Sequence, residues 1–545
     1  MTGMLFGLHP LHVETAVWLS ARPDLMCALF FLLSMLAYTN YADRQEQGTA
    51  AKGSVRRVFN VQYVLSLAFF VLALASKPMA VSLPAVLLIL DWYPFRRMNS
   101  RKRLVDMFME KIPFMAVGFL VAIVTIAAHE RKGAIGSLIT VPLEARLLIA
   151  AKSVLSYLWK MALPFDLLPF YPYPARIPTL SGEYLLSVVL VCVITAACIR
   201  MMKKERMFMA AWFFYLVTLL PISGVITVRM ATMADRYTYI PSLAPFLLLG
   251  VGSAGLWARV ESARRWSAMG RHAVVGTALL FGIVMIFLTV HQTAIWRNSI
   301  TLWSYVIEKA PDRVPTAYIN RGMALKEIGQ IEGAIADYTT AIALWPDNSE
   351  IFMKRGWAFK ETGQIEQAIN DYTEAIRLNP SDGDAYIIRG LLLVYSGHPD
   401  RGVNDFDRAI SLKPANGDAY LNRGVAYERM GDLQRAIKDY DMAISLNPSD
   451  FLGYRNRGVA FREAGQVSMA LADFNRAVLL NPDSSEIYLS RGDLYRNEGS
   501  VDRAIKDYRR ACDLGSNEAC DALGSLVGTH KMEGAKTGTG SDVVK

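Results

Sequence analysis

The chain has 545 residues, of which 53% are hydrophobic and 20% are charged, and its formal net charge is +9. Up to about Trp296, long apolar runs alternate with short basic loops, which excludes a cytosolic enzyme. The positive charge belongs largely to these loops and is not a nucleic-acid footprint. The five cysteines show no CxxC or Cys/His metal spacing, so the sequence predicts no metal site.

The first apolar run, 4–20, lacks the basic region and the small-residue cleavage site of a signal peptide. It carries or precedes an unusual set of ionisable side chains: His9, His12, Glu14, Arg22 and Asp24. Ionisable groups at membrane depth are costly and by default mark a functional cavity. The alternative is that the two histidines are hydrogen-bonded interior groups and that Glu14 lies at the water interface.

Nine segments are long or apolar enough to be candidate membrane spans: 4–20, 25–42, 58–75, 79–93, 113–129, 184–199, 208–228, 237–257 and 273–295. The loops 43–57, 94–104, 200–206 and 258–272 are rich in Lys and Arg. Cytoplasmic loops hold the basic residues, so the chain is predicted to begin inside and to emerge outside after Trp296.

One further apolar run, 146–163, would reverse this topology if it crossed the membrane. We therefore expect 130–182 to lie wholly outside, with 146–163 as an amphipathic helix on the outer leaflet. Lys152 and Lys160 suit that interfacial position. The proline-rich sequence LPFYPYP that follows cannot form regular helix and indicates a rigid loop.

The predicted outer face gathers several cations and few anions. Its candidate phosphate ligands are Arg22, Lys77, Arg229 and Arg236. Such side chains bind phosphate oxygens through charge-assisted hydrogen bonds, so the surface suits a lipid-linked phosphate. The alternative for Arg229 and Arg236 is that they are interfacial anchors that reach lipid headgroups.

From Pro315 the sequence repeats with a period of 34 residues. Each unit carries Arg-Gly, a second Gly, Asp followed by an aromatic residue, and Ala at fixed positions, and five units end in Pro. This is the tetratricopeptide period and pattern, and six repeats should stack into a superhelix with a concave face. The arginine and aspartate recur in every repeat, which favours pairing between the two helices of each unit over a ligand site. Residues that vary between repeats are the candidates for recognition: Met323, Trp357, Leu391 and Asp493.

The order of motifs HPLHVETAVWLSARPDL, SKPMAVSLP, LDWYPF, LPFYPYP, MADRYTYIPS and WRNSITLW, leading into these repeats, resembles the transmembrane and tetratricopeptide-repeat glycosyltransferases. The resemblance covers nearly the whole chain. It implies a type-C glycosyltransferase fold, O-mannosyltransferase-like, in a bacterial member. It also implies a polyprenyl-phosphate-linked sugar as the donor, used on the outer face.

The sequence departs from that family at its start. The family's first span, its acidic first outer loop and its second span have no counterpart here, so the catalytic carboxylate cannot be carried over. Glu14 and Asp24 are the remaining candidates to position donor or acceptor. His9 and His12 are the candidates to line the sugar pocket, and Asp235 and Tyr237 are further candidate pocket residues.

The sequence therefore predicts an all-α protein, with a multi-pass transmembrane helical domain followed by a tetratricopeptide-repeat α-solenoid. The predicted parts are 1–296 for the membrane domain, 297–314 for a linker or capping helix, 315–518 for the repeats, 519–529 for a capping helix and 530–545 for a disordered tail. Cys512 and Cys520 lie on adjacent helices and are either bonded or two buried thiols.

The predicted function is transfer of a sugar from polyprenyl phosphate to a protein acceptor in the bacterial inner membrane, with the repeats on the periplasmic side. The expected partners are membrane lipid, the lipid-linked sugar and a protein or peptide bound by the repeats. Two alternatives stay open: a non-enzymatic membrane-anchored scaffold, which the missing acidic loop favours, and a polysaccharide ligase or polymerase.

Overall fold

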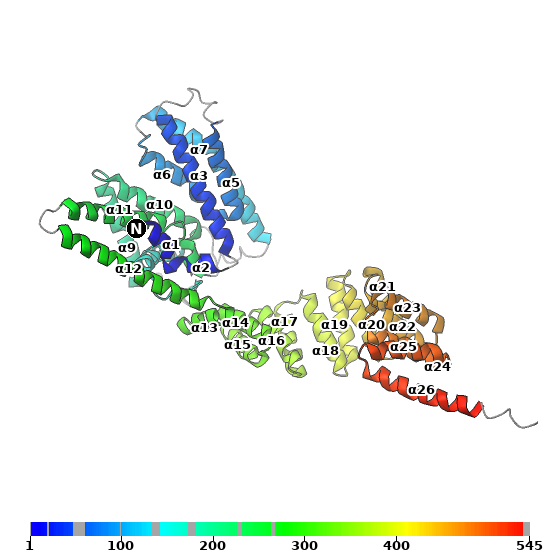
Figure 1. Cartoon of the computed structure of the whole chain (residues 1–545). Helices are drawn as coiled ribbons and strands as arrows, with labels where there is room; N and C mark the ends of the chain where they lie inside the picture. Colours follow the sequence, from blue (N-terminus) through cyan, green and yellow to red (C-terminus); the bar gives the residue numbers. More distant parts are fainter. Residues whose placement is uncertain are drawn as a thin grey trace, which may run out of the picture. The chain divides into compact units, whose positions relative to one another are not determined.

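The computed structural model describes residues 2–18, 21–46, 60–98, 100–131, 142–172, 181–223, 225, 231–262 and 267–537. It divides into two compact units, Met1–Ala317 and Tyr318–Lys545 (Figure 1). The division falls close to Pro315, where the first repeat was predicted to begin. The first unit is a group of apolar helices and the second is a helical repeat array, which confirms the predicted fold class.

The first unit contains, in chain order, α1 (Thr2–Leu8), η1 (Pro10–His12), α2 (Val13–Val17), α3 (Arg22–Glu46), α5 (Val61–Ser76), η3 (Pro78–Ser82), α6 (Leu83–Trp92), α7 (Arg101–Arg131), α8 (Leu143–Ala162), β1 (Tyr171–Pro172), α9 (Gly182–Met201), α10 (Arg206–Leu219), η5 (Leu220–Ile222), β2 (Ala231–Met233), η6 (Asp235–Thr238), α11 (Leu243–Ser262), α12 (Ser267–Ile295) and α13 (Ser299–Lys309). β1 and β2 pair antiparallel and form a small departure from an all-helical unit.

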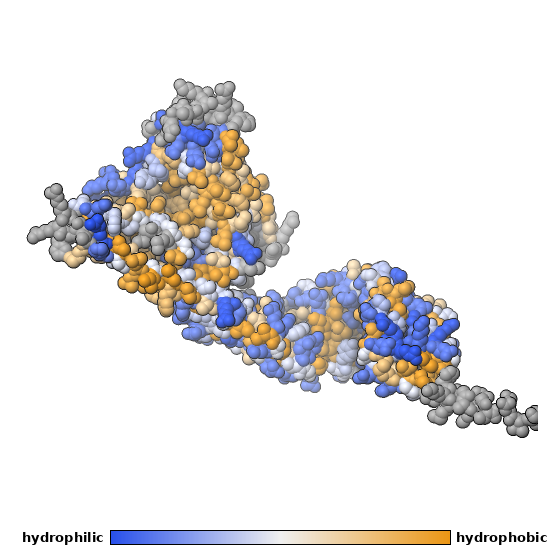
Figure 2. Space-filling view, viewed as in Figure 1, coloured by the Kyte–Doolittle hydropathy of each residue, from blue (hydrophilic) through white to orange (hydrophobic). Residues whose placement is uncertain are grey.

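In the described part of the chain, five helices are long and apolar enough to cross a membrane: those within Arg22–Gln45, Arg103–Ala128, Gly182–Met201, Leu243–Ser262 and Met269–Ile295. Three shorter apolar helices lie at Val61–Ser76, Pro78–Trp92 and Arg206–Ile222. These eight correspond to the predicted spans from 25–42 onward. Large side chains on them, such as Phe119, Leu280 and Phe287, are exposed, as expected of helices that face lipid. Figure 2 shows such an apolar surface over α3 and α5.

The prediction of one spanning helix over 4–20 is wrong. The segment forms two short helices, α1 and α2, separated by the 3-10 turn η1. Pro10 has no backbone N–H to continue a helix, and the His9 side chain accepts a hydrogen bond from the Leu11 backbone. The predicted helix over 146–163 is confirmed as α8, and its position in the outer leaflet stays a prediction.

A buried cluster of charged side chains joins α3, α6 and α7. Asp91 and Lys111 are fully buried and form an ion pair. Arg97 donates to Asp91 at 2.7 Å and to Glu110 at 3.2 Å, and Tyr38 donates to Asp91. Two cations and two carboxylates balance each other, so the cluster avoids an uncompensated charge in an apolar interior.

The second unit and the segment leading into it contain α14 (Pro315–Glu327), α15 (Ile331–Leu344), α16 (Ser349–Glu361), α17 (Ile365–Leu378), α18 (Gly383–Tyr395), α19 (Pro399–Leu412), α20 (Gly417–Arg429), α21 (Leu433–Leu446), α22 (Phe451–Glu463), α23 (Val467–Leu480), α24 (Ser485–Asn497), α25 (Val501–Asp513) and α26 (Asn517–Thr537). The two helices of a repeat approach closely at the glycine that follows the repeated arginine. A Cβ added at Gly322, for example, would lie 2.7 Å from the Tyr338 ring. Gly329 has φ +79° and allows the tight turn between α14 and α15.

The predicted arginine–aspartate pairing is confirmed in all six repeats. The pairs are Arg321–Asp337, Arg355–Asp371, Arg389–Asp405, Arg423–Asp439, Arg457–Asp473 and Arg491–Asp507. The last five arginines also reach the preceding repeat: Arg355 donates to Thr339 at 3.1 Å and Arg457 donates to Asp441 at 2.6 Å. These side chains therefore hold the array together within and between repeats.

The end of the array resolves two open questions. Cys512 and Cys520 form a disulfide that joins α25 to α26. The last helix begins at Asn517, two residues before the predicted cap, and continues to Thr537. The prediction of disorder from 530 is therefore wrong for 530–537, and 538–545 lies outside the described residues.

Candidate functional site

The structure brings the first segment of the chain against η6. The buried carboxylate of Glu14 accepts hydrogen bonds from the Arg236 backbone N–H at 2.9 Å and from its guanidinium at 2.5 Å. Arg236 also donates to the Pro169 carbonyl at 3.0 Å. This arginine, predicted to bind phosphate, therefore ties three segments together.

A second ion pair takes up the next predicted site residues. Lys77 lies within 2.5 Å of both carboxylate oxygens of buried Asp24. Arg22 is exposed at the start of α3, and Arg229 lies outside the described residues. A buried carboxylate needs a close partner of opposite charge. Arg236 and Lys77, which the sequence predicted to bind phosphate, instead neutralise Glu14 and Asp24.

The two histidines are hydrogen-bonded interior groups, which is the alternative given by the sequence. His9 Nε2 lies 3.0 Å from the Met161 carbonyl, and its Nδ1 accepts from the Leu11 N–H. His12 lies 2.7 Å from the Phe6 carbonyl and 3.0 Å from the Ser242 hydroxyl. Both rings are buried and fully partnered, and neither lines the cavity described next.

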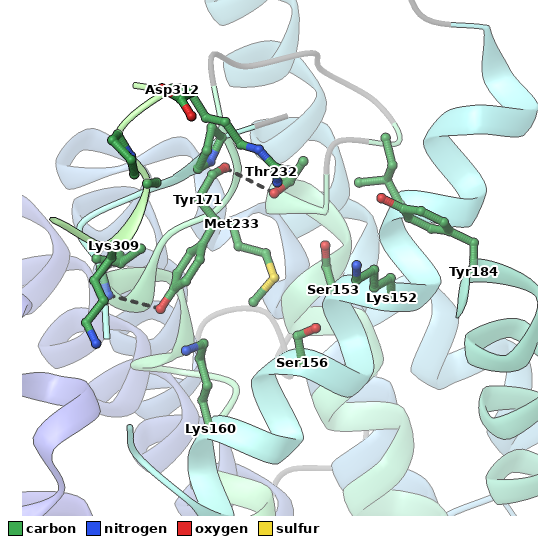
Figure 3. Close-up of a pocket in the computed structure, with 16 residues that line it drawn as sticks. Lys152, Ser153, Ser156, Lys160, Tyr171, Tyr184, Thr232, Met233, Lys309 and Asp312 are labelled. Atoms are coloured by element: carbon green, nitrogen blue, oxygen red, sulfur yellow. Dashed lines mark hydrogen bonds between the residues drawn. The ribbon is translucent and has the colours of Figure 1, made fainter. Parts of the chain in front are cut away.

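A cavity of about 610 Å³ lies beside α8, the β1–β2 pair and the segment after α13. Figure 3 shows Lys152, Ser153, Ser156 and Lys160 along one face of α8, at helical spacing. The lining of the cavity also includes Tyr171, Tyr184, Thr232, Met233, Lys309, Asp312 and Arg313. Four cations and several hydroxyls thus surround a space with one carboxylate, which is the chemistry of an anion site.

The cations of this cavity differ in their bonding. Lys152 pairs with Glu183 at 2.5 Å and Lys309 pairs with Asp166 at 2.6 Å, and both pairs are partly exposed. Lys160 donates to the Phe165 and Asp166 carbonyls, and burial lowers its pKa. Exposed ion pairs contribute little to stability, so Lys152 and Lys309 can exchange their partners for a ligand.

Asp235 lies behind the cavity wall, and Tyr237 lies beside Arg236. Tyr171 lines the cavity and donates its hydroxyl to Asp235 at 2.9 Å. The buried Tyr237 ring lies 4.9 Å from the Arg236 guanidinium carbon. Asp235 therefore supports a lining residue of the cavity, and neither Asp235 nor Tyr237 is part of the lining.

Asp235 should make stability depend on pH. Burial raises the pKa of its carboxyl well above the usual range, and the charge of Glu14 adds to this. The folded state then holds the proton more tightly than the unfolded state, so the stabilisation is complete below the unfolded pKa and is lost as pH rises through the folded pKa. In the Asp235→Asn variant the unfolding temperature should fall less with rising pH than in the wild type. Parallel curves for the two proteins would contradict this, and Asp502→Asn at an exposed position of α25 is the control.

Only part of this site is predictable from the sequence. The sequence predicts an interfacial position for Lys152 and Lys160 and indicates no role for Lys309 or Arg313. The spacing of Lys152, Ser153, Ser156 and Lys160 was a usable signal, since it places cations and hydroxyls on one helix face. Among the described residues no group of three or more His, Cys, Asp or Glu could hold a metal ion.

The predicted recognition residues of the repeats divide into two kinds. Met323 and Trp357 line one pocket formed by the first helices of the early repeats. Leu391 packs partly against the core, and Asp493 accepts a hydrogen bond from Tyr508 at 2.7 Å.

Family models match the second unit over most of its length. Two models described as "Tetratricopeptide repeat" match 417–450 and 455–519, and a third, described as "TPR repeat", matches 322–363 and 356–397. The second unit is a tetratricopeptide-repeat array. A tetratricopeptide repeat protein from Parabacteroides merdae is 22% identical, with a TM-score of 0.36, and the match covers 42% of this chain and 90% of that one.

The curated relatives are distant in sequence. Protein O-mannosyl-transferase Tmtc1 from Drosophila melanogaster is 33% identical over 121 residues, which cover 22% of this chain and 13% of the relative. Protein O-mannosyl-transferase TMTC1 from Homo sapiens is 22% identical over 382 residues, covering 64% of this chain and 42% of the relative. The chain thus spans less than half of the length of these relatives. The similarity to these protein O-mannosyl-transferases is therefore weak and partial.

Proposed function

We propose that this chain belongs to a membrane glycosyltransferase that moves a sugar from polyprenyl phosphate to a protein acceptor. The observation that carries the proposal is the cavity lined by Lys152, Lys160, Lys309 and Arg313. The reaction class is that named for the relatives, protein O-mannosyl transfer. The tetratricopeptide repeats would bind the acceptor or a partner.

The cavity would act on the phosphate of the donor. Lys152 and Lys309 would exchange their exposed ion pairs for the phosphate oxygens, Arg313 would add a guanidinium, and the hydroxyls of Ser153 and Ser156 would complete the hydrogen bonding. As the bond between sugar and phosphate breaks, negative charge grows on the departing phosphate. Fixed cations stabilise that charge and so lower the barrier. We place this cavity on the non-cytoplasmic face, as the basic loops predict.

The test is transfer of radiolabelled mannose from polyprenyl-phosphate mannose to protein, with the purified chain in lipid nanodiscs and its native membrane proteins as acceptors. The variant Lys152→Gln/Arg313→Gln removes two exposed cations without touching the buried pairs. Loss of two charge-assisted hydrogen bonds should lower transfer about 100-fold.

The matched control is Lys413→Gln/Arg435→Gln, which removes two exposed cations from the repeats. Unchanged transfer in the cavity variant would overturn the assignment of the cavity. Label that appears in a lipid-linked polymer instead of protein would favour the ligase or polymerase alternative.

A second candidate is a non-enzymatic membrane scaffold. It is favoured by one observation: Glu14 and Asp24, the candidate catalytic carboxylates, are each held by a cation. A wild-type protein that binds polyprenyl phosphate but transfers no sugar, while its repeats still bind protein, would support the scaffold.

A further inference from the structure

One buried aromatic position recurs along the repeats. It is occupied by Tyr338, Tyr372, Phe406, Tyr440, Phe474 and Tyr508, all of them almost completely buried. Phenylalanine stands there in two of the six repeats. The packing of a repeat therefore does not require the hydroxyl, and each tyrosine must find a partner for its O–H or leave it unsatisfied.

The four tyrosines differ in that respect. Tyr440 donates to Glu428 at 2.7 Å and Tyr508 donates to Asp493 at 2.7 Å. The hydroxyls of Tyr338 and Tyr372 have no hydrogen-bond partner among the described residues. The repeat position of Glu428 holds Lys326 in the first repeat, and that of Asp493 holds Met323. Neither side chain accepts a strong hydrogen bond, so the Tyr338 donor is left over.

Tyr338 lies in the wall of a pocket of about 320 Å³ formed by α14, α15, α16 and α18. The pocket is lined by Met323, Lys326, Glu327, Tyr338, Glu350, Met353, Lys354, Trp357 and Ile388. Met323 is 37% exposed. Methionine side chains are flexible, so an incoming acceptor can reach the hydroxyl.

The charges of this pocket cancel. Lys354 pairs with Glu350 at 3.0 Å, and the Lys326 ammonium lies 4.1 Å from the centre of the Trp357 ring. Two lysines and two glutamates line the same space, so it gives no net preference for a charged ligand. Its apolar wall and the unpaired Tyr338 hydroxyl favour an uncharged group with an acceptor beside it.

We propose that this pocket binds an extended peptide segment with a bulky uncharged apolar side chain. That side chain packs against Trp357, Met323 and Met353, and a neighbouring main-chain carbonyl accepts the hydrogen bond of the Tyr338 hydroxyl. The inference rests on the proposed binding of a protein acceptor or partner by the repeats. It specifies which part of the array binds the peptide and which chemical groups of the peptide are recognised.

The experiment measures fluorescence anisotropy of a labelled serine–glycine peptide with a central leucine–phenylalanine–leucine run, using the full chain in nanodiscs. Peptides with aspartate or lysine in place of the apolar run serve as competitors. Tyr338→Phe should weaken binding roughly five- to tenfold, the worth of one hydrogen bond. Trp357→Ala should weaken it about thirtyfold or more, as expected of a central aromatic contact.

Tyr372→Phe is the matched control, because it also removes an unpartnered buried hydroxyl but does not line this pocket. It should bind the peptide like the wild type. Neither Tyr338→Phe nor Tyr372→Phe should lower the unfolding temperature, whereas Tyr440→Phe, which breaks the bond to Glu428, should lower it.

Equal binding by wild type and Tyr338→Phe would overturn the inference, as would no binding by the wild type or tighter binding of a charged competitor. Sugar transfer is measured separately and does not enter this assay. Loss of transfer with intact peptide binding would therefore refute the enzyme proposal alone, and the converse would refute only the peptide site.

Discussion

Lys111→Met is expected to lower the stability of the first unit by about 3–5 kcal/mol, the usual cost of leaving a buried charge without its partner. Lys111 is fully buried, and its ammonium contacts Asp91 and the Tyr38 hydroxyl. Removing it leaves two carboxylates, Asp91 and Glu110, with one guanidinium, that of Arg97. The measurement is the shift in thermal unfolding temperature of the purified protein in one detergent.

The double variant Asp91→Asn/Lys111→Met removes one charge of each sign and is the matched control. It should recover much of the lost stability, because the cluster is again neutral. If Lys111→Met unfolds at the wild-type temperature, or if the double variant is no more stable than the single one, the cluster does not stabilise this unit.

Arg236→Ala is expected to destabilise the first unit by a similar amount, about 3–5 kcal/mol, rather than to act only on donor binding. Glu14 is 2% exposed and would lose its guanidinium partner, and the Pro169 carbonyl would lose a donor. The expected result is a lower unfolding temperature and reduced recovery from membranes. The same thermal measurement in detergent checks it.

The variant Glu14→Gln/Arg236→Met distinguishes the two roles of this arginine. It removes the uncompensated carboxylate, so it should unfold at a higher temperature than Arg236→Ala. An Arg236→Ala protein with wild-type stability and lost sugar transfer would instead restore the arginine to the phosphate site that its position in the sequence predicted.

The parts of the fold that depend on local pattern could be predicted. The repeats were recognisable because Gly, Arg and Asp keep one register, and a shared register gives the same Arg–Asp pair in each repeat. The longer apolar helices were recognisable by length and composition. The exception, 4–20, failed because hydropathy does not register that Pro10 interrupts the hydrogen bonds of a helix.

The sequence predicted which segments contribute to the site but not which side chains contact one another. Glu14 and Arg236 are 222 residues apart in sequence, and a charge pattern cannot show that they neutralise each other. The cationic cavity depends on the approach of α8 to the segment after α13, which no local spacing encodes. The buried Asp91–Lys111 pair was missed for a related reason: in a hydropathy profile both residues only make the apolar run shorter.

The arginines that join neighbouring repeats set a mechanical property of the array. Each from Arg355 to Arg491 holds the aspartate of its own repeat and a side chain of the repeat before it, as Arg423 holds Asp439 and Asp407. These hydrogen bonds couple each repeat to the one before it, so the array should resist bending as a unit wherever they are continuous. Loss of the Arg423 side chain would uncouple the repeats in the middle of the array and leave two shorter rigid segments. Loss of the Arg491 side chain would uncouple only the last repeat. Where a defect lies thus determines how far the array can carry a load.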